Sequence, residues 1–289
     1  MDCALDARTA NRSRQKVAEI NSILMESTFR IHGPKKGQAA NNLAFGTAFL
    51  LAKPKTGSDL AYHVLVSAKH VYEDIEGDFA YINLRIKKSD ESYEQKLHPV
   101  RLRDKGVPLY VVHKEADVAA VYVDMPDDFK AVIVPTPLLA TDELIKEYGL
   151  HPGDELSCLG YPLFVSNEFG FPILRSGKLA SYPLLPTSVN KQCLFDPHVY
   201  EGNSGGPVYM VSPNRFYGGG THIGIVQMVV GLVTAQLSSK VYNNQPISMG
   251  AVVPAPYIVQ TLSLLPDEYR IGWSHNNCER TFKFSRVAD

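Results

Sequence analysis

The chain of 289 residues is 45% hydrophobic and carries a formal net charge of −1. This length exceeds that of an average domain, and the apolar content suffices for one large all-β unit with a sizeable core. The near-neutral charge excludes a global field that attracts nucleic acid or anionic lipid, and no stretch approaches the roughly 18 uncharged apolar residues of a transmembrane helix.

Two features bear on the compartment in which the protein works. Charged residues interrupt the N-terminal segment, which therefore lacks the apolar core of a signal peptide. The four cysteines, Cys3, Cys158, Cys193 and Cys278, show no metal-ligand spacing such as C-x-x-C. We therefore expect a cytoplasmic protein with free thiols, no metal and no cofactor, and a disulfide between Cys158 and Cys193 is the alternative.

Residues 1–27 form a predicted helical extension. Between residues 6 and 27, Val17, Ile20 and Leu24 follow helical spacing with charged residues between them. Such a stripe either binds a regulatory partner or packs on the outside of the β-structure, and the second is the more common use.

Residues 28–140 are predicted to form a first set of short strands. Two of them, at 43–51 and 61–67, are joined by a polar loop and predict a hairpin. The other predicted strands are at 81–86, 96–102, 109–112 and 118–123.

Residues 141–265 carry a second set of strands between two helices. The first helix, at 141–148, has Thr141 as its N-cap, and the last, at 254–265, has one apolar face. The predicted strands are at 155–160, 173–182, 191–195, 221–236 (a hairpin or two strands) and 248–253. Many short strands with Gly and Pro turns indicate an all-β barrel or sandwich, and residues 266–289 form a tail.

Residues 201–207 read Glu-Gly-Asn-Ser-Gly-Gly-Pro and place Ser204 between glycines. A serine hydroxyl needs a base to become a nucleophile, and that base needs an acid to orient it. His70 closes a β-rich run, and Asp117 opens the apolar run at 118–123. The order is therefore His, Asp, Ser, with gaps of 47 (117 − 70) and 87 (204 − 117) residues.

These three segments resemble the catalytic motifs of trypsin-like (chymotrypsin-fold) serine peptidases, over about residues 43–265. The likeness is to the disulfide-poor bacterial-type branch. It implies two six-stranded antiparallel β-barrels with an N-terminal and a C-terminal helix. The first barrel, 28–140, would carry His70 and Asp117, and the second, within 141–265, would carry Ser204.

The resemblance also implies a role for each site residue. His70 would take the proton of Ser204, Asp117 would orient the imidazole, and the backbone N–H groups of Gly202 and Ser204 would bind the oxyanion. The hydroxyl of Thr234 would support Asp117. The substrate would be a protein or peptide.

Three further residues concern specificity and activation. By resemblance, His198 would line the primary pocket, and the strand carrying Thr234 and Gln236 would pair with the substrate backbone. Trypsin-type members have an acid where His198 stands, so polar, acidic or medium apolar side chains are expected at the cleaved position. Asn203 replaces the aspartate that zymogen-type members pair with a new N-terminus, so the intact chain should be active.

Two other functions compete with this interpretation. Residues 202–206 also satisfy the G-x-S-x-G motif of α/β-hydrolase esterases. That fold requires an acid and a histidine after the serine, which leaves Asp267 and His275, and it requires alternating strands and helices that are not seen here. The second competitor is a peptidase fold used as a catalytically silent binding module.

Overall fold

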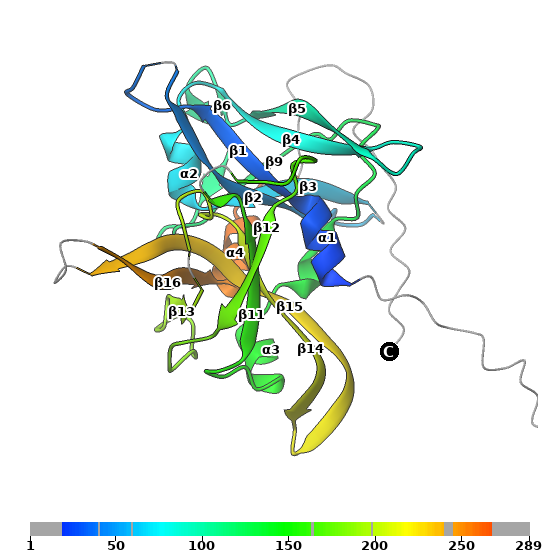
Figure 1. The fold of residues 1–289 in the computed structure, drawn as a ribbon, viewed down its shortest axis with the longest axis vertical. Helices are drawn as coiled ribbons and strands as arrows, with labels where there is room; N and C mark the ends of the chain where they lie inside the picture. Colours follow the sequence, from blue (N-terminus) through cyan, green and yellow to red (C-terminus); the bar gives the residue numbers. More distant parts are fainter. Residues whose placement is uncertain are drawn as a thin grey trace, which may run out of the picture.

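The computed structural model describes residues 19–39, 41–58, 60–162, 165–197, 199–239 and 245–267. This part of the chain is mostly β-structure, with an eight-stranded sheet, a six-stranded sheet and a small two-stranded ribbon. Figure 1 shows the first sheet in blue and cyan on one side of the molecule and the second in green to orange on the other. No helix that the structure describes is both long and apolar enough to cross a membrane.

The first sheet has the order β5-β4-β1-β2-β3-β9-β8, and β10 pairs in parallel with β2. The predicted hairpin is confirmed, because β2 and β3 pair antiparallel from Ala48↔Ser67 to Pro54↔Ala61. The apolar run Val64, Leu65 and Val66 is fully buried. The strands are β1 (Thr28–Pro34), β2 (Leu43–Pro54), β3 (Ala61–Ser67), β4 (Phe79–Lys87), β5 (Tyr93–Arg101), β8 (Val111–Val112), β9 (Ala119–Tyr122) and β10 (Val134–Pro135), and β6 (Arg103–Asp104) pairs with β7 (Val107–Pro108).

The second sheet has the order β12-β11-β14-β15-β16-β13. The expected break in the run at 221–236 is wrong, because β15 is one long strand whose hairpin partner is β14. The turn falls earlier, at Gly218 and Gly219, which both have positive φ. The strands are β11 (Glu155–Gly160), β12 (Ile173–Lys178), β13 (Cys193–Phe195), β14 (Pro207–Tyr217), β15 (Gly220–Ser239) and β16 (Gln245–Pro254).

The α-helices are short, from six to nine residues. The predicted cap of α3 (Asp142–Glu147) is confirmed, because Thr141 Oγ1 accepts the N–H of Leu144 at 3.3 Å. α4 (Ala255–Ser263) buries the predicted face, including Ile258 and Leu262. The remaining helices are α1 (Ile20–Ser27), α2 (Lys69–Asp74) and the 3-10 turn η1 (Thr136–Leu138).

The described part of the N-terminal helix packs into the fold. Ile20 and Leu24 of α1 are fully buried, so the apolar stripe proposed for a regulatory partner is already covered by the protein itself. Val17 and the rest of the predicted helix lie outside the described residues.

The expected pair of six-stranded barrels is confirmed only as a mostly β fold with two sheets. The first sheet has eight strands because β1 and β10, which we did not predict, add to β2 and its neighbours. In the described part of the chain, the order of the first sheet does not return to its first strand. The two ends of the second sheet meet at an isolated bridge, Leu179↔Phe195, where β12 ends beside β13.

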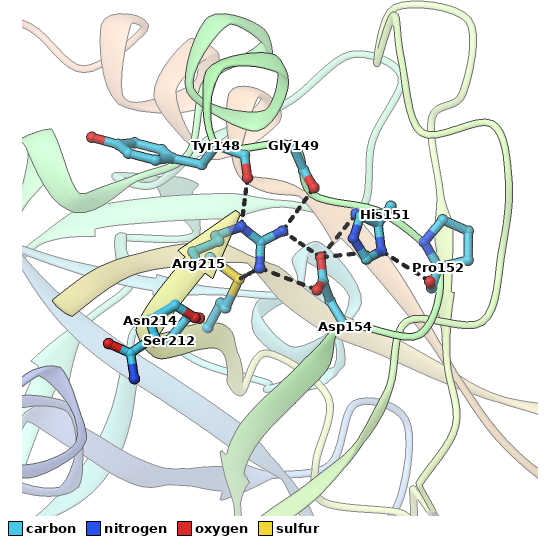
Figure 2. Close-up of polar contacts among 9 residues, drawn as sticks. Tyr148, Gly149, His151, Pro152, Asp154, Ser212, Asn214 and Arg215 are labelled. Atoms are coloured by element: carbon cyan, nitrogen blue, oxygen red, sulfur yellow. Dashed lines mark hydrogen bonds and ion pairs between the residues drawn. The ribbon is translucent and has the colours of Figure 1, made fainter. Parts of the chain in front are cut away.

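A buried ion pair joins the hairpin of the second sheet to the loop after α3. The guanidinium of Arg215 on β14 donates to both carboxylate oxygens of Asp154, at 3.1 and 2.6 Å. It also donates to the carbonyls of Tyr148 and Gly149, as Figure 2 shows. Both charged side chains are nearly buried, at 8% and 12% exposure, and these contacts together offset the cost of removing the two charges from water.

The two described cysteines are free thiols within the second sheet. Cys158 on β11 and Cys193 on β13 are both buried and unpaired with each other, so the alternative of a disulfide between them is wrong. Burial raises the pKa of each thiol to about 12, which keeps both protonated and unreactive.

Candidate active site

His70 and Asp117 meet where two neighbouring strands of the first sheet end. β3 leads into α2, so His70 is the second residue of a short helix rather than the end of a strand. Asp117 lies in the loop before β9, and the pairing Ser67↔Ala119 brings that loop beside α2. The Nδ1 of His70 lies 2.7 Å from Oδ2 of Asp117, and the backbone N–H of His70 donates to Oδ1 at 3.0 Å.

The protonation states of this pair follow from its contacts. The hydrogen bond with Asp117 raises the pKa of His70 above 6.5, against the opposing effect of partial burial. Burial by itself raises the pKa of Asp117, but the hydrogen bonds and charge of His70 outweigh it and the net shift is downward. Because an ionised carboxylate can only accept, Nδ1–H is the donor, and the lone pair of Nε2 is left to take a proton.

The loop with Ser204 crosses onto the first sheet beside α2. Gly205 has a φ of 87°, and a Cβ there would collide with the carbonyl oxygen of Thr47 and the hydroxyl of Ser67. A Cβ on Gly46 would lie 2.7 Å from the side chain of Val71 and 3.1 Å from the carbonyl oxygen of Ser204. The glycines therefore allow the Ser204 backbone to pack against the segment that carries His70.

Thr47 ties the serine loop to both sheets and is a site residue that the sequence reasoning missed. Its hydroxyl donates to the carbonyl of Gly202 at 2.6 Å and accepts the N–H of Tyr161 at 3.2 Å. Its backbone N–H donates to the carbonyl of Ser204 at 2.8 Å. The signal in the sequence is a threonine within the otherwise apolar run of β2, and the structure shows that this residue is fully buried.

The amides around Ser204 fall into two groups. Those of Asn203, Gly205 and Gly206 donate to carbonyls within the protein. The N–H groups of Gly202 and Ser204 have no acceptor among the described residues. The two amides expected to bind an oxyanion are therefore the two that remain available for a ligand.

The hydroxyl of Ser204 donates to the carbonyl of Thr234 at 3.1 Å. Among the contacts described for Ser204 and His70, none joins the two side chains. Catalytic hydrogen bonds are often long in the absence of substrate and shorten when it binds, so this hydroxyl has to turn toward Nε2 of His70 before it can react.

The expected role of Thr234 is corrected by its contacts. Its hydroxyl donates to the carbonyl of Ala251 at 3.3 Å and not to Asp117. The serine loop is bonded to β15, because the N–H of Gly205 donates to the carbonyl of Val233 at 2.7 Å. Thr234, the next residue, serves the site through its backbone carbonyl, which accepts from Ser204.

The strand expected to bind substrate has one free edge. β14 begins at Pro207, which pairs with Leu232, so beyond this point β15 pairs only with β16, as in Gln236↔Gly250. No strand that the structure describes covers the other edge after Thr234. His198, expected in the primary pocket, lies outside the described residues.

In the ranges that the structure describes, no group of three or more His, Cys, Asp or Glu residues could hold a metal ion. No protein-family model and no curated protein matches this chain.

Proposed function

We propose that this chain is a trypsin-like serine endopeptidase that cleaves protein or peptide substrates through an acyl-enzyme. The observation that carries the proposal is the oriented pair of His70 and Asp117 beside the glycine-flanked Ser204. The pair leaves Nε2 of His70 free to act as a base, and the serine loop leaves two N–H groups free to bind an oxyanion.

The proposed reaction uses these groups in sequence. Ser204 Oγ attacks the carbonyl carbon while its proton passes to Nε2 of His70, and Asp117 stabilises the imidazolium. The N–H groups of Gly202 and Ser204 bind the negative oxygen of the tetrahedral intermediate, each donor being worth roughly 3 kcal/mol in hydrolases of this chemistry. His70 then protonates the leaving amine, and water attacks the acyl-enzyme by the same route.

The free edge of β15 supports an extended peptide as the substrate. A peptide that pairs with this edge would lie beside Ser204, which already touches the carbonyl of Thr234. The division of the site also supports a two-barrel fold, since His70 and Asp117 belong to the first sheet and Ser204 precedes β14 of the second. The free thiols Cys158 and Cys193 favour a reducing compartment such as the cytoplasm.

The test is to label the intact chain with a fluorophosphonate probe and to assay it with a peptide library. We expect one covalent label on Ser204 and cleavage of the library, and we expect both to be absent in Ser204→Ala. Ser212→Ala is the matched control, because this exposed hydroxyl donates only locally to the carbonyl of Asn214.

Two outcomes would overturn the proposal in favour of its competitors. Hydrolysis of esters without cleavage of any peptide would favour an esterase, although the mostly antiparallel sheets differ from the parallel sheet of the α/β-hydrolases. Folded protein that neither binds the probe nor cleaves would favour a binding module.

A further inference from the structure

The loop that presents Asp117 is folded around the side chain of another histidine. His113 Nδ1 lies 3.1 Å from the backbone nitrogen of Glu115 and 3.0 Å from that of Ala116, and both N–H groups donate to it. The backbone N–H of His113 donates to the carbonyl of Val118 at 3.0 Å and closes the loop. The imidazole of His113 therefore accepts the backbone N–H groups of the two residues just before Asp117.

These contacts fix the tautomer of His113. A ring nitrogen that accepts two N–H groups cannot itself carry a proton, so Nδ1 of His113 is bare. The proton is then on Nε2, which lies 2.9 Å from Oε1 of Gln260 on α4 and donates to it. Protonation of Nδ1 would remove the acceptor on which Glu115 and Ala116 depend.

Neighbouring elements hold the ring in this orientation. The ring of Tyr257 on α4 contacts His113 edge-on, with centroids 5.0 Å apart and an interplanar angle of 85°. The ammonium of Lys191, just before β13, forms an exposed ion pair with Glu115 at 2.7 Å. The loop is thus held to α4 through His113, and to the segment just before β13 through Glu115.

We propose that His113 is a positioning residue: its neutral imidazole holds the loop in the conformation that directs Asp117 at His70. The catalytic consequence of this inference rests on the proposed function, whereas the contacts of His113 are independent of it. If the loop relaxes, Asp117 withdraws from Nδ1 of His70, and the imidazolium of His70 loses its main stabilising partner.

The charged groups around both histidines are few. Lys114, Glu115 and Lys191 lie around His113 together with the phenol of Tyr257. Around His70 the charged groups are Asp117 and, from its own helix, Lys69, Glu73 and Asp74. Removal of His113 changes none of these charges directly, so a shift in the titration of His70 reports a movement of Asp117.

The test compares His113→Ala, His113→Asn and Gln260→Ala in the intact chain, with Asp117→Asn as the benchmark. The titration of His70 is followed by NMR of its imidazole, which needs no catalytic activity. Asparagine is the rescue variant, because its side-chain oxygen can accept N–H groups two and three residues ahead, as Nδ1 does. His222→Ala is the matched control, since that exposed ring stacks on Tyr217 far along the β14–β15 hairpin.

In His113→Ala we expect the pKa of His70 to fall by about half a pH unit or more, toward the value in Asp117→Asn. We expect kcat per probe-titrated active site to fall about tenfold, and His113→Asn to restore most of both values. Gln260→Ala should give a smaller shift in the same direction. In the wild-type protein, ¹⁵N chemical shifts should show a bare Nδ1 and a protonated Nε2 on His113.

Three results would overturn the inference. They are a pKa of His70 in His113→Ala that equals the wild-type value, a failure of His113→Asn to restore the lost values, and the opposite tautomer of His113. The last measurement needs no variant and stands even if His113→Ala does not fold. If the wild-type protein cleaves nothing but His70 still shifts in His113→Ala, the positioning role stands and the proposed peptidase activity fails.

Discussion

The carboxylate of Asp117 binds His70 at two points. One oxygen accepts the backbone N–H at the start of α2 at 3.0 Å, and the other accepts Nδ1–H of the ring at 2.7 Å. The backbone contact holds α2 against the loop, and the ring contact sets the direction of Nε2. One acid therefore fixes both where the histidine lies and how it is turned.

The first prediction concerns pH. The base must be neutral to accept a proton, and Asp117 raises the pKa of His70 above 6.5. Activity should therefore fall as the pH decreases, with a midpoint above 6.5. The pH profile of kcat/KM on a neutral peptide measures this midpoint, and a midpoint well below 6.5 would contradict the ring contact.

The two members of this pair both stabilise the folded state, but their contributions depend on pH in opposite directions. The raised pKa of His70 stabilises the folded state at low pH, and this contribution is lost as the pH rises through the folded value. The lowered pKa of Asp117 stabilises the folded state at higher pH, and this contribution is lost as the pH falls through the acidic range. The profile of activity, and not that of unfolding, is therefore the direct test of the base.

The second prediction is that Asp117→Asn leaves the fold intact but lowers kcat by on the order of 10⁴-fold, since the amide would favour the wrong tautomer of His70. The double variant Asp117→Asn, Ser204→Ala should be no slower than Ser204→Ala alone, because the residues act as a unit. Kinetics normalised to folded protein measure both effects. Additive losses would mean that the two side chains do not share one reaction.

The third prediction tests the crossing of the serine loop. Gly205→Ala places a methyl group against the carbonyl of Thr47 and imposes a φ of 87° on alanine, so we expect probe labelling to fall at least 100-fold. Gly57→Ala is the matched control, because its φ is 73° and nothing lies within 4 Å of the added carbon. Equal labelling rates in the two variants would show that the loop does not need this close approach.

The fourth prediction concerns the buried ion pair in Figure 2. Arg215→Ala leaves the carboxylate of Asp154 buried without its main partner, so we expect a loss of about 3–5 kcal/mol in the free energy of unfolding. Lys178→Ala removes an exposed pair with Glu155 and should cost less than about 1 kcal/mol. Urea unfolding measures both, and a similar cost for the two variants would be the contrary result.

The fifth prediction is that the intact chain is active without N-terminal cleavage. Thr28 opens β1 fully buried and paired with Phe49, so a chain end made here would have to leave the first sheet to reach the serine loop. Asn203 is buried against Gly160, and a Cβ added to Gly160 would lie 2.5 Å from Oδ1 of Asn203. The neutral amide of Asn203 cannot form an ion pair with a new N-terminal amine. Probe labelling of mass-verified intact protein tests this. Activity that appears only after a cut between residues 28 and 45 would refute it.

Short-range patterns determined much of the fold. The two strand-like runs at 43–51 and 61–67 and the polar loop between them predicted the β2–β3 hairpin. The Thr141 cap predicted the start of α3, and one apolar face predicted α4. These features succeed because the residues that decide them lie within one turn or one strand of each other. The order of His70, Asp117 and Ser204 likewise follows from local motifs.

Other features depended on partners far away in the chain. β1 was missed although Phe29 and Ile31 alternate with Arg30 and His32, because this alternating run is short and β2 and β4 on either side supply its hydrogen bonds. Arg215 has the character of a surface residue and is buried only because Asp154, 61 positions earlier, neutralises it. Charge and alternation in the sequence cannot reveal such pairing.

The candidate site likewise combines residues that the sequence identified with contacts that only the structure showed. His70, Asp117 and Ser204 could be identified in the sequence by residue type and spacing, because a base, an orienting acid and a nucleophile each require a particular side chain. Only the tertiary structure assigned Thr47 to the serine loop, turned the hydroxyl of Thr234 away from Asp117, and placed His113 under the aspartate loop. Each of these depends on a hydrogen bond between a side chain and a backbone group. Because almost every residue has the same backbone groups, the sequence does not show which of them forms the bond.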